Sequence, residues 1–297
     1  TCHEVMEPQY TRYLQSSHAR VKCVECHIGA GADWYVRSKL SGVRQVFATI
    51  GNTYSRPIPT PVQHLRPAEE TCERCHWPEK FYSSFEISRQ YFPSEEAEHS
   101  SWFLRMLIQM GSSGDRKTGI HSHMNIDNDI YYHAEDEKRQ EITWVKSVDK
   151  NGNETIYTSP DSKYKEQEPA AELIRKMDCI DCHNRPTHRF WPPYKLVNLA
   201  MQTKAIDPTL PGIKAVAVDA LSAEYANKQE AAHAIEQTLR KHFQKEFGGE
   251  YNQHKEKVDN AIKEIISVYG QHFFPKMKAR WDSYPENIGH MLTPGCF

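Results

Sequence analysis

Apolar residues recur at helical spacing in several parts of the chain. From Asp33 to Ile50 they fall every three or four positions with basic residues between them, which predicts an amphipathic helix. A shorter helix is predicted over 8–18, where a proline suits the first helical turn. We expect a further short helix over 169–178. Two long helices are predicted over 217–247 and 251–270, and because only a Gly-Gly pair separates them we expect an antiparallel pair.

The middle of the chain follows a different pattern. The segments 126–133, 141–148 and 154–158 are rich in β-branched and aromatic residues, which favours strands, and the apolar segment 100–110 is also predicted as a strand. The strands predicted over 141–148 and 154–158 flank Asn151-Gly152, a strong hairpin signal. Together these elements predict a mainly α protein with little regular secondary structure, a small antiparallel β insertion and a C-terminal pair of long helices.

Three copies of the pattern C-x-x-C-H stand out among the eight cysteines. In this pattern the two thiols add across the vinyl groups of a haem, and the histidine binds the iron from one side. A zinc site would need cysteine pairs combined into four-ligand sets and would not place a histidine directly after each pair. The motifs therefore predict covalently bound haem c. The attaching thiols and proximal ligands are Cys23, Cys26 and His27, then Cys72, Cys75 and His76, then Cys179, Cys182 and His183.

The two remaining cysteines lie at the ends of the sequence. Cys2 is followed by His3, as in the second half of such a motif, and Cys296 could open another. Two free thiols, or a disulfide between the ends, are the alternatives. We favour truncated haem motifs, so that three complete sites are joined by two partial ones and the sequence is expected to be a segment of a longer chain.

Several further histidines are candidate iron ligands. His188 lies five residues after the last complete motif and is more suited to a neighbouring haem than to its own. His121 and His123 would share one side of an extended segment, and one of them is expected to bind iron. His64, before the second complete motif, and His290, before Cys296, are open candidates.

Composition and charge agree with a haem protein. The 37 basic and 39 acidic residues give no case for nucleic-acid binding. Hydrophobic residues make up only 38% of the chain and mean hydropathy is -0.74, a low value that haem macrocycles within the core would explain. The 16 histidines exceed what the attachment motifs need, as expected if most irons bind two imidazoles. Bacterial haem attachment takes place outside the cytoplasmic membrane, which predicts a periplasmic protein. With no run of 18 apolar residues in view, any membrane anchor is expected before Thr1.

The order of these motifs resembles the NapC/NirT-type membrane-anchored quinol dehydrogenase cytochromes. The resemblance is carried by Cys2 to Pro8, Ser17-His18, Cys23 to His27 and Cys179 to His188. It covers roughly residues 1–80 and 175–190, and the rest looks more like the larger multihaem members of metal-reducing bacteria. It implies an N-terminal membrane helix, several haems, and electron transfer from quinol to periplasmic reductases.

Individual residues take roles from this resemblance. Met6 corresponds to a methionine that ligates the first iron in some relatives, although it stands three rather than two residues after His3, which leaves both as candidates. His18 and His188 correspond to distal ligands. Lys39 corresponds to a lysine near the quinol pocket, and Asp33 is the substitute for an acid that has no direct counterpart here.

Four regions are expected along the chain: a NapC/NirT-like haem-binding region (1–91), a β-rich insertion (92–168), a second haem-binding region (169–212), and a helical pair leading to a truncated motif (213–297). The predicted function is electron transfer from membrane quinol, through stacked and mostly bis-His haems, to a periplasmic or outer-membrane redox partner. One alternative is a reductase with an open iron for nitrite, hydroxylamine or a sulfur oxyanion. All three complete motifs end in histidine, which argues against this alternative. The other is a conduit or filament subunit, and a homo-oligomer is left open.

Overall fold

The computed structural model describes residues 4–29, 31–62, 66–77, 81, 83–93, 101–111, 119–121 and 127–288. Its N-terminal part contains short helices and one long one: η1 (Glu4–Met6), α1 (Glu7–Leu14), α2 (Cys23–His27), α3 (Ala32–Ile50) and α4 (Ala68–Thr71). The helix predicted over 33–50 is confirmed as α3. The helix predicted over 8–18 begins as expected but ends at Leu14, where the Ser16 hydroxyl donates to the carbonyl of Tyr13 at 2.8 Å and competes with continued helix.

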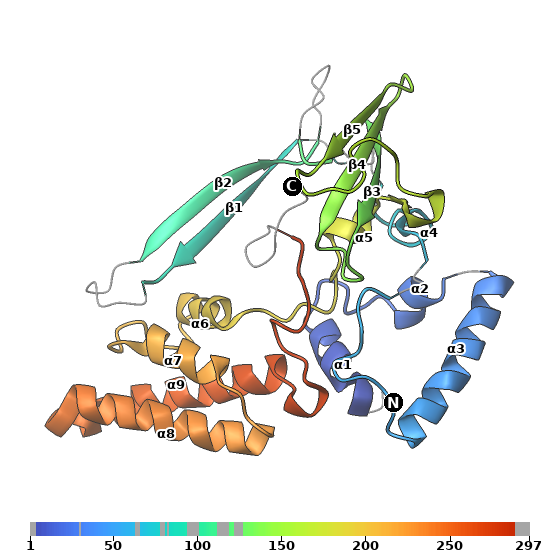
Figure 1. Cartoon of the computed structure of the whole chain (residues 1–297). Coiled ribbons are helices and arrows are strands. Elements are labelled where there is room, and N and C mark those ends of the chain that lie inside the picture. Colours follow the sequence, from blue (N-terminus) through green and yellow to red (C-terminus); the bar gives the residue numbers. More distant parts are fainter. Residues whose placement is uncertain are drawn as a thin grey trace.

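The strands form two antiparallel sheets (Figure 1). One is the pair β1 (Ser84–Tyr91) and β2 (Trp102–Gln109), and the other has the order β5-β4-β3-β6. Its strands are β3 (Asn128–Ala134), β4 (Ile142–Asp149), β5 (Glu154–Thr158) and β6 (Arg175–Lys176). The strands predicted within 100–110 and 126–158 are confirmed, as is the β4–β5 hairpin. The sequence interpretation missed β1, although Phe85, Ile87 and Tyr91 alternate with polar residues.

The helix predicted over 169–178 is wrong. Only a 3₁₀ turn, η4 (Ala171–Leu173), forms there, and β6 follows it. Strand β6 pairs with β3 at Tyr131–Lys176 and Tyr132–Arg175, and Met177 is buried against the same sheet. The open edge of β3 and the burial of Met177 outweigh the local helical preference of this segment.

The C-terminal part is an α-helical unit built from α6 (Pro193–Gln202), α7 (Ile213–Ser222), α8 (Lys228–Phe247) and α9 (Tyr251–His272). The helix predicted over 217–247 is split into α7 and α8. The break follows from Asn227, whose side chain accepts hydrogen bonds from the backbone of Gln229 and Glu230 and so begins a new helix. Helices α8 and α9 form the expected pair, with Gly248 and Gly249 in the connecting turn η5 (Gly248–Glu250). Helix α6 was not predicted, because its N-terminal proline was interpreted only as a break.

The protein core lies almost entirely in this C-terminal unit. The largest fully buried apolar cluster includes Val197, Ile206, Leu221, Ile235, Leu239, Phe243, Val258 and Ile265. By contrast, α2, α3 and the short helix α5 (Cys179–Cys182) contain no buried residue. The part of the chain that carries the cysteine motifs is therefore poor in apolar protein core, as expected where apolar macrocycles fill the interior. Within the described residues no helix has the length and apolarity needed to cross a bilayer.

Candidate haem-binding site

The three complete motifs present their cysteines on short helical turns. Helix α2 carries Cys23 and Cys26, a turn after α4 carries Cys72 and Cys75, and α5 carries Cys179 and Cys182. Residues three apart lie on one side of a helical turn, so each pair of thiols can meet one ligand edge. None of these six thiols is in a disulfide, and all are at least partly exposed. Each motif therefore has two accessible thiols ready for thioether bonds.

The motifs converge around Cys72. Its thiol acts electrostatically on both Cys26 and Cys179, so the second motif lies near both the first and the third. Burial is the larger cause in both cases and raises the pKa of Cys179 to about 11, whereas the charge of Cys72 adds to the rise. A direct contact joins the second and third motifs, because the backbone N–H of Ala68 donates to Asp178, the cap of α5, at 3.4 Å.

Each motif histidine faces a second imidazole from a distant part of the chain. The ring centroids lie 6.0 Å apart for His18 and His76, 6.4 Å for His27 and His188, and 6.3 Å for His121 and His183. Two imidazoles that bind one metal from opposite sides, each at a metal–nitrogen distance of about 2 Å, have ring centroids about 6 Å apart. The side chains thus fit a haem iron between the rings of each pair.

Hydrogen bonds select the nitrogen that two of these distal imidazoles present. Nδ1 of His188 lies 3.0 Å from the carbonyl oxygen of Gln9, and Nδ1 of His121 lies 2.9 Å from that of Met110. A carbonyl can only accept, so Nδ1 carries the proton and Nε2 is left as the free donor atom for a metal. The corresponding contact of His18, with the Ser17 hydroxyl at 3.3 Å, is longer.

Burial favours the neutral, metal-binding form of three imidazoles, those of His27, His183 and His188. It lowers the pKa of His27 and of His183, and it lowers the pKa of His188 to about 4, with the positive charge of Arg185 as the second cause.

The third motif is also fixed by a residue that the sequence did not single out. Asp181, between the two cysteines, is 6% exposed and accepts hydrogen bonds from Tyr132 at 2.9 Å, Arg139 at 3.2 Å and Arg175 at 3.0 Å. Tyr132 and Arg175 belong to β3 and β6. The four-stranded sheet therefore holds the third motif in place, which gives the β insertion a structural role beside the haem site.

The residues expected at a quinol pocket are exposed. Lys39 and Asp33 are exposed on α3, and the Lys39 ammonium lies over the ring of Tyr35 at 5.0 Å from its centroid. Met6 is at the end of η1 and is 39% exposed. Six further residues predicted to attach haem or bind iron fall outside the described residues: Cys2, His3, His64, His123, His290 and Cys296.

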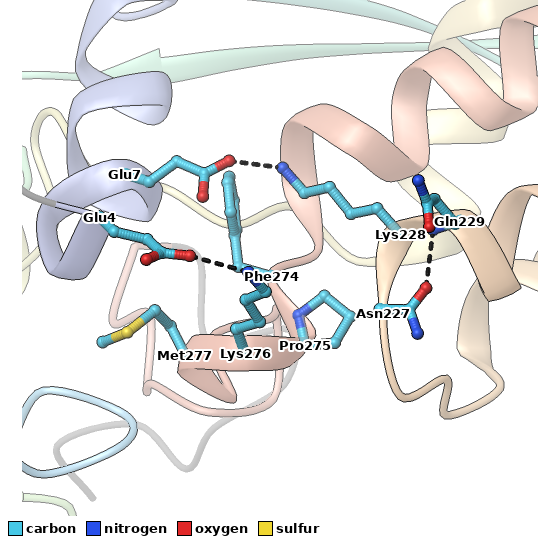
Figure 2. Close-up of a pocket in the computed structure, with 9 residues that line it drawn as sticks. All are labelled: Glu4, Glu7, Asn227, Lys228, Gln229, Phe274, Pro275, Lys276 and Met277. Atoms are coloured by element: carbon cyan, nitrogen blue, oxygen red, sulfur yellow. Dashed lines mark hydrogen bonds and ion pairs between the residues drawn. The ribbon is translucent and has the colours of Figure 1, made fainter. Parts of the chain in front are cut away.

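A cavity of about 330 Å³ lies between η1 and the beginning of α8 (Figure 2). Two ion pairs cross it, Glu7 with Lys228 at 2.7 Å and Glu4 with Lys276 at 2.9 Å, and Phe274 contributes an apolar wall. The charges are thus neutralised in pairs. Glu4 directly follows Cys2-His3 and Glu7 stands three residues further on, and the sequence interpretation singled out neither acid.

Comparison with known proteins adds to this picture. The chain is 42% identical over all 297 residues to the cytochrome c-type protein ImcH of Geobacter sulfurreducens, and it spans 58% of the length of that protein. Over 78 residues, 25% of this chain and 44% of the relative, it is 36% identical to the cytochrome c-type protein NrfH of Wolinella succinogenes. No protein-family model and no solved structure matches the chain.

Proposed function

We propose that the chain is a c-type cytochrome of the NapC/NirT type and that it carries electrons from a membrane quinol to a redox protein of the periplasm or outer membrane. Proteins of this class bind haem c covalently. When bound, haem supplies reversible one-electron storage on its iron. The chain's own residues attach the macrocycle, set the axial ligands and determine which sites are neighbours.

The proposal rests above all on the three pairs of imidazole rings. We assign His188 to the haem of Cys23 and Cys26, His18 to the haem of Cys72 and Cys75, and His121 to the haem of Cys179 and Cys182. Every distal ligand then comes from outside the motif it completes. An iron with two imidazoles has no vacant position for a substrate, so these sites suit electron transfer and not reduction of a small molecule.

The same ligand exchange favours a connected relay. Because His188 follows the third motif but faces the first, and His18 precedes the first but faces the second, the chain ties the three sites to one another. Together with the contacts among Cys26, Cys72 and Cys179, this supports electron passage in the order of the motifs, with the second in the middle.

Helix α3 supports an orientation toward the membrane. It has no buried residue, and Leu40, Phe47 and Ile50 are 69%, 70% and 79% exposed on one apolar stripe. Arg37, Lys39 and Arg44 are its only basic residues, against the single acid Asp33. Exposed apolar and basic residues on one helix are typical of a helix at a membrane surface. Figure 1 shows α3 at one edge of the molecule, apart from the sheets and the C-terminal helices. We propose that α3 lies against anionic lipid of the inner membrane, where the protein is anchored.

This orientation brings Lys39 to the level at which a quinol headgroup would arrive. Quinol oxidation releases two protons for two electrons, so a group beside the quinol must accept or pass a proton. Lys39 is the proposed group, with Asp33 second. Glu4 and Glu7, at the cavity beside η1, are the acids closest in sequence to the first, truncated motif.

Reduction by two different donors tests the proposed function. In the membrane-anchored protein, Lys39→Ala should slow reduction by a menaquinol analogue and leave reduction by dithionite unchanged, because dithionite needs no quinol pocket. Lys263→Ala, on the exposed side of α9, is the matched control and should behave as the parent. Equal quinol rates for Lys39→Ala and parent would remove Lys39 from the mechanism, and a parent that quinol cannot reduce would favour the conduit.

A further inference from the structure

Two buried guanidinium groups hold the segment that presents His188. Nε of Arg185 donates to the carbonyl oxygen of His188 at 2.7 Å, and Nε of Arg12 donates to that of Arg189 at 2.7 Å. Arg12 is 5% exposed and Arg185 is 8% exposed. Arg12 lies on α1, the helix whose Gln9 accepts the hydrogen bond from His188. Arg185 therefore lies beside the imidazole that faces His27, and Arg12 holds the residue that follows His188 in the chain.

Within the residues that the structure describes, neither guanidinium forms an ion pair with a carboxylate. The other partners of Arg12 are the side chain of Gln15, the carbonyl of Gln271 and Nε2 of the neutral His272. Arg185 lies over two neighbouring aromatic rings, 5.2 Å from the centroid of Phe190 and 4.1 Å from that of Tyr284. The nearby carboxylate of Glu286 is ion-paired with Arg189.

Both groups nevertheless remain charged at neutral pH. An arginine guanidinium is not deprotonated in proteins, so burial leaves the charge in place. Burying a charge is costly, and two buried charges around one loop suggest that they act on a group bound there. In a water-poor site a fixed charge also acts strongly on its neighbours.

We propose that Arg12 and Arg185 raise the midpoint potential of one haem, the one attached through Cys23 and Cys26. The oxidised iron carries one more positive charge than the reduced iron, so two nearby cations disfavour the oxidised state and favour uptake of the electron that the quinol supplies. The inference rests on the proposed pairing of His27 with His188. Neither arginine is assigned contact with the iron, because both act through the segment that holds its ligand.

The third motif provides an internal contrast. It is also flanked by two arginines, Arg139 and Arg175, but these are paired with Asp181, and Arg175 also with Asp178. The positive and negative charges there balance. The described structure therefore predicts that the excess of buried positive charge acts on a single haem and leaves the potential of the third-motif haem unaffected.

The test is a spectroelectrochemical titration of the haem-loaded chain. Arg185→Gln and Arg12→Gln should each shift one haem to a lower potential while every haem stays low-spin. The shifted haem should be the one that turns high-spin in His188→Ala. Arg185→Lys keeps a positive charge and should stay near the parental potential. Arg240→Gln, which removes a guanidinium paired with Glu236 and Asp259, should shift no haem.

The outcomes separate charge from structure. Unchanged potentials in both glutamine variants would overturn the proposal, as would equal shifts in Arg185→Gln and Arg185→Lys. A high-spin haem in a glutamine variant would show that the arginine positions His188 without setting the potential, and this too would overturn it. If His188→Ala leaves all haems low-spin, His188 is not an iron ligand. That result contradicts the ligand assignment of the proposed function, whereas unchanged potentials contradict only this inference.

Discussion

At the scale of single residues, the decisive contacts involve backbone carbonyls. The carbonyls of Gln9 and Met110 fix the tautomers of His188 and His121, so that Nε2 of each ring is free to face its motif histidine. The sequence could identify His188 as a candidate by its distance from the third motif. It could not show which motif His188 faces, because that depends on contacts with α1, which is nearly 180 residues away. Residue type and spacing predict the chemistry of a ligand, whereas its partner depends on the fold.

His272 gives a prediction for the effect of pH on stability. Its ring is 6% exposed and accepts from Arg12 at 3.0 Å, and burial, with Arg12 as second cause, lowers its pKa to about 3. In the unfolded chain this histidine takes up a proton near pH 6.5. The unfolded state thus binds more protons between about pH 6.5 and 3, and the free energy of unfolding falls as the pH is lowered through this window, by at most about 1.4 kcal/mol per pH unit for this group.

The variant His272→Gln keeps an acceptor for Arg12 and removes the titration. Chemical denaturation at pH 7 and pH 4.5 should therefore show a smaller loss of stability for His272→Gln than for the parent. His233→Gln, an exposed histidine on α8, should show the parental loss. An identical pH dependence for His272→Gln and the parent would mean that the pKa of His272 is the same in the folded and unfolded states, which would contradict the lowered pKa.

At the scale of elements, regular patterns were predictable and edges were not. Helix α3 follows from its uninterrupted apolar spacing, and the β4–β5 hairpin follows from Asn151-Gly152. The division between α7 and α8 had a signal in Asn227 with Glu230 three residues later, a helix-start pattern that the long apolar period concealed. Strand β6 had no such signal, since it forms only because β3 offers an open edge.

Helix α3 leads to a prediction about lipid. If it lies on the membrane, replacing Leu40 and Phe47 by Ser should reduce binding of the haem-loaded chain to vesicles that contain anionic phospholipid, because about 25 cal/mol is lost for each Å² of apolar surface no longer buried. Co-sedimentation with such vesicles measures the effect. The matched control, Ile156→Ser with Tyr157→Ser, alters exposed apolar residues on β5 and should bind as the parent does. Equal binding by both double variants would contradict the proposed orientation.

At the scale of the whole molecule, the chain divides into a part with a protein core and a part without one. The C-terminal helices bury a continuous apolar cluster. By contrast, α2 and α5, the helices that carry the first and third motifs, bury none of their residues. Low mean hydropathy together with three C-x-x-C-H motifs predicted that haem would replace part of the apolar core, but not where along the chain. The proximity of each motif histidine to a distant histidine was not predictable in full, because each pair joins residues at least 58 positions apart.

The central claim, that distal histidines cross from one motif to another, can be tested by one measurement of spin state in two backgrounds. In the parent, His188→Ala should convert one haem from low-spin to high-spin, because attachment needs only the cysteines and the proximal histidine. In a background that lacks the first complete haem, Cys23→Ser with Cys26→Ser, the same substitution should have no further effect on the spectrum. His233→Ala should change neither background. A high-spin haem that arises from His188→Ala in the background without the Cys23–Cys26 haem would contradict the account, as would unchanged low-spin absorbance in the parent.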